Sequence, residues 1–178
     1  YEIHERLVGS EMCIRDSCNN LRDRAMIDFL LSTGIRVGEL VRLNIDDIDF
    51  SERECVVYGK GDKERKAYFD AKTKIHLLNY IESRTDNNIA LFVSLNKPHS
   101  RLTESGVELR LREMGKKLGV EKVHPHKFRR TMATRAIEKG MPIEQVQKIL
   151  GHEQIDTTLR YAMVNQNNVK LSHRKYIS

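Results

Sequence analysis

Cysteine, proline and long apolar runs are all scarce in this sequence. Its three cysteines have no CxxC or CxxH spacing, so they cannot close a disulfide framework and they form no zinc motif. No apolar stretch approaches the roughly 18 residues of a membrane-spanning helix, and the first residues lack the basic start and apolar stretch of a signal peptide. With 10 Gly and 3 Pro, the composition is neither collagenous nor disordered. These absences predict a globular protein in a reducing, cytoplasmic setting, with no membrane partner.

The charge that is present is unevenly distributed. Lys and Arg together number 31 against 25 acidic residues, which gives a net charge of +6. Residues 97–178 contain 17 basic and 8 acidic residues, so this part of the chain carries +9, whereas residues 1–96 are slightly acidic. A field of this kind favours an anionic partner such as nucleic acid, although a solvated basic face is the simpler alternative.

The length of 178 residues fits one ordinary domain. Residues 1–18 show neither a helical nor an alternating apolar period, and their segment LVGSEMCIRDS resembles the translation of a sequencing adapter. We therefore expect residues 1–18 to be a non-native leader outside the fold. Residues 19–178 should form the domain, and the native coding sequence should continue upstream of Asn19.

From Asn19 onward, capping residues and periodicity predict regular elements. The region 55–69 reads as two strands joined by the Gly-rich turn GKGDKER, which is a hairpin with a basic tip. The first expected helices are 21–33, with Asn20 as cap and Gly34 as stop, 37–43, and one after Asp70 that carries Ile75, Leu78 and Ile81. Two longer helices are expected at 103–118 and 126–139. The last three are one with Pro142 at its first position and Gly151 as stop, one that is capped by Asp156 and contains Tyr161, and one at 169–177. The predicted fold class is mainly α with a small antiparallel β-sheet.

Several basic residues and one tyrosine could carry chemistry. Taken singly, each has an ordinary explanation, such as a solvated turn lysine, a capped connector or a packed aromatic side chain. In chain order, however, they read Arg, Lys, His-x-x-Arg, Gly-His, and then Tyr nine residues after the last His. The residues are Arg36, Lys60, His126, Arg129, His152 and Tyr161. This ordered set is improbable by chance.

The motifs around these residues are TGIRVGEL, GKGDKER, HPHKFRRT and LGHEQIDTTLRY. With them, residues 19 to about 176 resemble the catalytic domain of the tyrosine recombinases, the phage integrase family that includes the Xer resolvases and conjugative-transposon integrases. The resemblance implies the catalytic-domain fold of that family and site-specific DNA recombination or integration. It places Arg36, Lys60, His126, Arg129, His152 and Tyr161 at the catalytic positions, and Glu39 at a supporting acidic position. One departure is Arg130, where the family often has His; another is the absence of the usual preceding core-binding domain.

These residue types suit strand cleavage. Two guanidiniums can hold the non-bridging phosphate oxygens through charge-assisted hydrogen bonds. Tyr161 would be the nucleophile, with His126 as the candidate base, His152 as a phosphate hydrogen-bond donor, and Lys60 as the acid that protonates the leaving 5′ oxygen. The 3′-phosphotyrosyl linkage conserves the bond energy for religation, so neither ATP, a cofactor nor a metal is expected.

The resemblance also implies partners and a location. Double-stranded DNA, a homotetramer on synapsed sites and accessory directionality proteins are expected, in a bacterial or phage-encoded protein associated with the nucleoid. Three alternatives stay open: a non-catalytic DNA-binding regulator that uses the helix pair 132–150, a type IB topoisomerase, and a metal nuclease that uses His124, His126 and His152. The Gly-His to Tyr spacing favours the recombinase branch over the topoisomerase.

Overall fold

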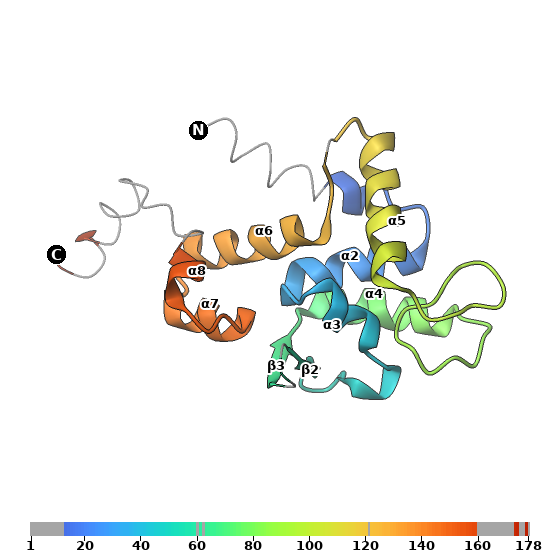
Figure 1. The fold of residues 1–178 in the computed structure, drawn as a ribbon, viewed down its shortest axis with the longest axis horizontal. Coiled ribbons are helices and arrows are strands. Elements are labelled where there is room, and N and C mark those ends of the chain that lie inside the picture. The colour runs from blue at the N-terminus through green and yellow to red at the C-terminus, as the bar shows by residue number, and fades with distance from the viewer. Residues whose placement is uncertain are drawn as a thin grey trace. The chain divides into compact units, whose positions relative to one another are not determined.

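The computed structural model describes residues 13–59, 61, 63–120, 122–159, 173–174 and 177. The chain divides into two compact units, Tyr1–Met132 and Ala133–Ser178, each of which is described by itself. The elements, shown in Figure 1, are α2 (Leu21–Thr33), α3 (Val37–Arg42), the 3-10 turn η1 (Ile45–Asp47), β1 (Ile48–Asp49), β2 (Glu54–Tyr58), β3 (Glu64–Tyr68), α4 (Ala71–Glu82), α5 (Glu104–Lys117), α6 (Pro125–Glu138), α7 (Ile143–Leu150) and α8 (Ile155–Leu159). The boundary between the units falls within α6.

The fold class is as predicted: mostly helical with a small antiparallel sheet. The sheet has the order β1-β2-β3. The hairpin was expected, and the short strand β1 extends it, with Ile48 opposite Cys55 and Cys55 opposite Ala67. The inward positions Cys55, Val57 and Ala67 are buried, so one face of the sheet closes the core of the first unit.

Local signals set the ends of the helices. The Asn20 side chain accepts a hydrogen bond of 2.8 Å from the backbone N–H of Asp23 at the start of α2, and Asp70 caps α4 by accepting from Thr73 N–H at 2.8 Å. Gly34 ends α2 with φ of 62° and Gly151 ends α7 with φ of 63°, a left-handed conformation that costs glycine little. These caps and stops confirm the predicted ends of α2 and α7 and the start of α4.

The helix expected after Asp70 is present as α4 and carries Ile75, Leu78 and Ile81. Ile75 is 56% exposed, because α4 packs against α2 through the face that carries Leu77 and Tyr80. Two expectations about individual residues are wrong. Pro142 is the residue before α7 and not its first helical residue. Asp156 lies inside the first turn of α8, which begins at Ile155, and so is not its cap. The predicted helix 169–177 lies outside the described residues except for 173–174 and 177.

The core of the first unit gathers α2, α3, the sheet, α4 and α5. Phe29 of α2 lies near Phe69 and Phe92, with ring centroids 5.7 Å and 6.3 Å apart, and Tyr80 stacks on Phe92 at 5.7 Å. Ile14 is fully buried in this core, so the described part of the 1–18 segment packs with the domain. That this segment is a non-native leader stays a prediction.

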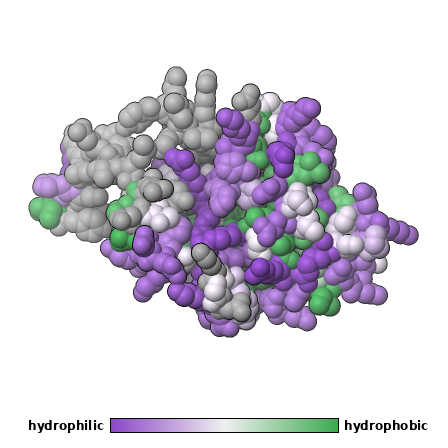
Figure 2. Space-filling view, in the orientation of Figure 1, coloured by the Kyte–Doolittle hydropathy of each residue, from purple (hydrophilic) through white to green (hydrophobic). Residues whose placement is uncertain are grey.

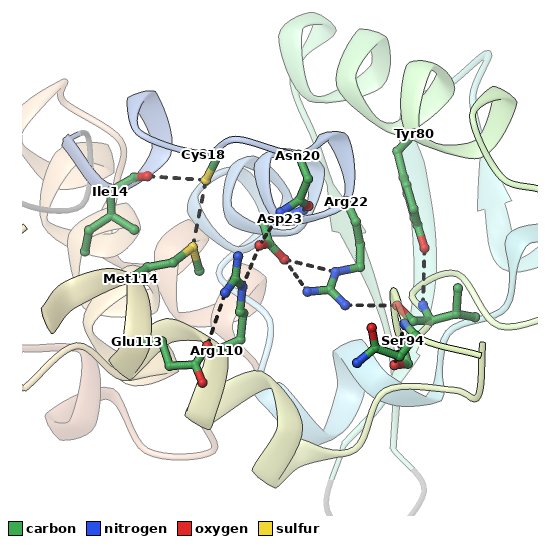
Figure 3. Close-up of polar contacts among 12 residues, drawn as sticks. Ile14, Cys18, Asn20, Arg22, Asp23, Tyr80, Ser94, Arg110, Glu113 and Met114 are labelled. Atoms are coloured by element: carbon green, nitrogen blue, oxygen red, sulfur yellow. Dashed lines mark hydrogen bonds and ion pairs between the residues drawn. The ribbon is translucent and has the colours of Figure 1, made fainter. Parts of the chain in front are cut away.

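A buried carboxylate fastens α2 to α5. Figure 3 shows Asp23 between two guanidiniums: Arg22 Nε donates to it at 2.9 Å and Arg110 Nε at 2.6 Å. Burial raises the pKa of Asp23, but Arg22, Asn20 and Arg110 outweigh it, so the pKa lies below its usual range. Arg22 also donates to the Val93 carbonyl at 3.2 Å. This network fixes the position of α5, from which the chain continues to α6.

One face of the molecule is mostly polar. On the face drawn in Figure 2, hydrophilic side chains predominate and apolar ones form separate small patches. In the described parts of the chain, no helix combines the length and the apolar character needed to cross a bilayer.

Candidate active site

Arg36 lies at the turn between α2 and α3. Gly34 reverses the chain at the end of α2, and Arg36 occupies the N-cap position of α3. Its side chain is 38% exposed, whereas that of Glu39, one turn later, is only 3% exposed. The Arg36 guanidinium therefore rests on the buried Glu39 carboxylate and extends toward solvent, where a phosphate could reach it.

Glu39 uses both carboxylate oxygens. Oε1 accepts from Arg36 Nη1 at 3.0 Å. Oε2 accepts from the backbone N–H of Arg36 at 2.7 Å and from Arg65 Nη2 at 2.6 Å. The backbone contact caps the first turn of α3, and the side-chain contacts join α3 to β3. The supporting acidic residue predicted from the sequence thus touches Arg36 through both its backbone and its side chain.

Arg65 is the second cation on Glu39. Its side chain is 12% exposed, and its Nε and Nη1 have no hydrogen-bond acceptor among the described residues. Burial lowers the pKa of Arg65, the Glu39 carboxylate raises it, and the Arg36 charge lowers it again, with a net shift below the usual range. Arg65 remains charged because the unperturbed pKa of arginine is far above neutrality.

The start of the GKGDKER turn lies against this group. Gly59 N–H donates to the Lys63 carbonyl at 2.9 Å and closes the base of the turn. A Cβ on Gly59 would stand 3.7 Å from Glu39 Oε1 and 3.9 Å from Arg36 Nη1. Lys60 itself lies outside the described residues, but its chain neighbour Gly59 is in van der Waals range of the Arg36–Glu39 pair.

Arg129 reaches the same turn from α6. It is 4% exposed, and its Nη1 donates to the Gly34 carbonyl at 2.5 Å. Phe128, fully buried, anchors this part of α6 in the core. The structure thus brings the second predicted arginine to the chain two residues before the first, although 93 positions separate Arg36 from Arg129 in the sequence.

The histidines before Arg129 are on the surface. His126 is exposed in the first turn of α6, and its ring centroid lies 6.2 Å from that of His124. Burial, together with the nearby His126 and Lys127, lowers the pKa of His124. Because His126 is exposed, solvent and substrate can reach its ring. Arg130, the departure from the family pattern, is also exposed.

His152 is held within the second unit by contacts of its backbone and of its ring. Its backbone N–H donates to the Gln147 carbonyl at 3.1 Å, and its carbonyl accepts from Gln147 Nε2 at 3.0 Å. Its ring Nδ1 lies 2.9 Å from Oγ1 of Thr158, which is fully buried. These contacts hold the backbone of His152 and one side of its ring, Nδ1, against α7 and α8. Tyr161, two residues beyond the end of α8, lies outside the described residues.

Two residues that contact the candidate site residues, Arg65 and Thr158, were not predicted from the sequence. Arg65 belongs to the GKGDKER motif, and the signal was its register: it pairs with Val57 across the hairpin, on the face whose other members are buried. A charged residue on an inward face requires a buried partner. Thr158 carried no comparable signal, because threonines are common in short helices.

Among the described residues, no group of three or more His, Cys, Asp or Glu side chains is placed to hold a metal ion.

Comparisons with known proteins identify similar chains. Residues 8–168 match the model of the phage integrase family. Tyrosine recombinase XerC of Staphylococcus aureus is 38% identical over 161 residues, which cover 88% of this chain and 53% of that protein. The crystal structure of XerA recombinase aligns with a TM-score of 0.79 and 33% identity, covering 97% of this chain and 63% of that one.

Two DNA-bound structures share the fold at lower identity. XerH recombinase bound to its difH substrate gives a TM-score of 0.74 at 24% identity over 93% of this chain and 51% of that one. The Tn1549 transposon integrase in complex with a circular intermediate DNA gives 0.77 at 21% over 94% of this chain and 62% of that one. The chain spans about half the length of the curated relatives it matches.

Proposed function

The chain belongs to the phage integrase family, and from this we propose that it is the catalytic part of a tyrosine-type site-specific recombinase. Its substrate would be double-stranded DNA, and its activity would be the cutting and rejoining of strands in recombination or integration. The observation that carries the proposal is the meeting of two arginines at one turn. Arg129 donates to the Gly34 carbonyl at 2.5 Å, two residues before Arg36, which rests on Glu39.

The proposed cleavage step begins with attack of the Tyr161 phenolic oxygen on the scissile phosphorus. The bond between phosphorus and the 5′ oxygen breaks, and a 3′-phosphotyrosyl linkage forms. His126 accepts the phenolic proton and Lys60 protonates the departing 5′ oxygen, so charge and protons balance. A 5′ hydroxyl of a new strand then attacks the linkage, and the proton transfers reverse. Because the phosphodiester is conserved, the cycle requires no ATP.

The remaining residues stabilise charge. Negative charge develops on the non-bridging oxygens, and paired guanidinium donors at Arg36 and Arg129 would offset it. The Nε2 of His152, oriented by the Thr158 contact to its other ring nitrogen, would donate to one of these oxygens. The set resembles an oxyanion site built from side chains, in which donors are placed before the charge appears.

A covalent-trapping experiment tests the proposal. The chain is incubated with a nicked duplex from which the cleaved end diffuses away, and denaturing gels report a protein–DNA adduct. We expect an adduct with the wild-type chain and none with Tyr161→Phe, which still binds DNA because only the phenolic oxygen is removed. An equal adduct yield from Tyr161→Phe would refute the assignment of the nucleophile.

Two further arms separate the alternatives. Arg36→Lys keeps the charge but loses the planar fork, so we expect cleavage to fail while binding persists. Cleavage should continue in EDTA, and strict Mg²⁺ dependence would favour the metal nuclease. DNA binding by the wild-type chain without any adduct would favour the non-catalytic regulator, and relaxation of supercoiled DNA without strand exchange would favour the type IB topoisomerase.

The proposed assembly is a homotetramer on two synapsed DNA sites, with accessory directionality proteins, in a bacterial or phage-encoded system associated with the nucleoid. Support comes from relatives: the XerH and Tn1549 integrase structures contain DNA. The +9 charge of residues 97–178 suits the phosphate backbone. Binding should therefore weaken steeply as salt rises, and cross-linking on DNA that carries two sites should trap four copies.

A further inference from the structure

The strand that returns from the hairpin tip carries Arg65, whose contact with Glu39 is the shortest that the carboxylate makes. Arg65 Nη2 lies 2.6 Å from Oε2, against 3.0 Å between Arg36 Nη1 and Oε1. The side chains of Glu39 and Arg65 are 3% and 12% exposed, whereas Arg36 is 38% exposed. The tighter and more buried ion pair on Glu39 is therefore made by Arg65.

The formal charges of Arg36, Glu39 and Arg65 do not cancel. Arg36 and Glu39 alone would be neutral, because one carboxylate cancels one guanidinium. With Arg65 the group carries one net positive charge. Since Coulomb interactions are stronger away from water, the buried pair compensates itself, and the net charge resides on the most exposed member, Arg36.

We propose that Arg65 is a positioning residue: by occupying Oε2 of Glu39, it prevents the carboxylate from neutralising Arg36, so that Arg36 keeps its charge for the scissile phosphate. The inference rests on the proposed function. Without Arg65, Oε2 of Glu39 would keep only its hydrogen bond from the Arg36 backbone N–H. The second acceptor site of Oε2 would then be open to the Arg36 guanidinium, and a bidentate pair with Glu39 would compete with phosphate. Repulsion between the two guanidiniums also favours the outward position of Arg36.

A purely structural role for Arg65 is the alternative, in which the ion pair only fastens β3 to α3. The two roles differ in their dependence on the charge of the substrate. A methylphosphonate at the scissile position replaces one non-bridging oxygen with a methyl group and is neutral. A residue that acts by maintaining positive charge at Arg36 should matter little on this DNA, whereas a displaced hairpin would impair both substrates.

The experiment measures single-turnover adduct formation by the 178-residue chain on phosphodiester and methylphosphonate DNA. We expect Arg65→Gln to slow cleavage of the phosphodiester at least about tenfold, less than the loss typical of removing a direct transition-state donor. On the methylphosphonate the loss should shrink to within about threefold. Arg65→Lys should remain within about threefold on both substrates, because an ammonium keeps the charge and can reach one oxygen.

The double variant E39Q/R65Q gives a second readout on ordinary DNA. It removes the carboxylate that would neutralise Arg36 and leaves no uncompensated buried charge. We therefore expect it to cleave faster than Arg65→Gln alone, by about threefold or more, a non-additivity expected of residues that act through one another. A fastening role predicts no gain in rate, because the ion pair is already absent in Arg65→Gln and the second substitution does not restore it.

Arg84→Gln is the matched control. Arg84 is another arginine with little exposure, 5% against 12% for Arg65, and it pairs with Asp86 and donates to the carbonyls of Asn88 and Ala90. Any loss it causes should be the same factor on both DNAs, and its thermal unfolding shows the cost of removing a structural arginine.

The outcomes separate the two claims. A wild-type chain that forms no adduct overturns the proposed function and this inference with it. A wild-type chain that forms the adduct, combined with equal losses for Arg65→Gln on both DNAs and a double variant no faster than Arg65→Gln, overturns the role of Arg65 alone.

Discussion

The contact between Thr158 and His152 allows a quantitative prediction about the rate of adduct formation. Nδ1 of His152 lies 2.9 Å from Thr158 Oγ1. We expect the hydroxyl to donate to Nδ1, which places the ring proton on Nε2, the tautomer that can donate to a phosphate oxygen. Thr158→Val replaces the hydroxyl by a methyl group of similar size and keeps the packing of this fully buried side chain. The change therefore removes the orientation of the imidazole while leaving the shape of α8 intact.

The magnitude follows from the bond. A neutral intramolecular hydrogen bond contributes about 1 kcal/mol net, and the same free energy in a barrier corresponds to about a fivefold change in rate. We expect Thr158→Val to form the covalent adduct about fivefold more slowly, while DNA affinity changes little. Single-turnover kinetics give the rate, and ¹⁵N NMR of the His152 ring reports the tautomer directly.

Thr158→Ser is the control, because it keeps the hydroxyl and loses the methyl group. It should retain the wild-type tautomer and a rate near that of the wild type. If Thr158→Ser is as slow as Thr158→Val, packing and not the hydrogen bond is what matters. An unchanged ring tautomer in Thr158→Val would refute the reasoning outright.

Three further predictions concern stability and the hairpin. Gly115→Ala should lower the melting temperature, because its Cβ would stand 2.4 Å from a methyl group of Val123, and overpacking of about 1–3 kcal/mol outweighs a helix-propensity gain of about 1 kcal/mol; a higher melting temperature would contradict this. The hydrogen bond from Arg84 lowers the pKa of Asp86 to about 2, so its stabilisation is present above about pH 4 and is lost as the pH falls toward 2. Asp86→Asn should therefore flatten this acid limb in urea titrations between pH 5 and 2. Lys60→Ala should be slow on normal DNA and near wild type on a bridging 5′-phosphorothiolate, whose thiolate leaves without a proton; equal defects on the two DNAs would remove Lys60 from the catalytic set.

Local rules predicted the ends of elements better than their buried faces. Asn20, Gly34 and Asp70 act through the backbone next to them, so their roles could be predicted without knowledge of the fold. The face of α4 could not be predicted in this way. Ile75 is apolar yet exposed, because the position of α2 decides which side of α4 is covered.

In the candidate site, too, some features could be predicted from the sequence and others required the tertiary structure. The sequence by itself led to the proposed reaction class and to the candidate residue types, since the ordered motifs around Arg36, Arg129 and His152 depend only on identity and spacing. Only the tertiary structure decided which groups meet: the Gly34 carbonyl with Arg129, and Glu39 with Arg65. The physical reason is that a motif reflects which residue type the chemistry requires at each position. The partners of a buried charge, in contrast, depend on which chain segments pack together from distant parts of the sequence.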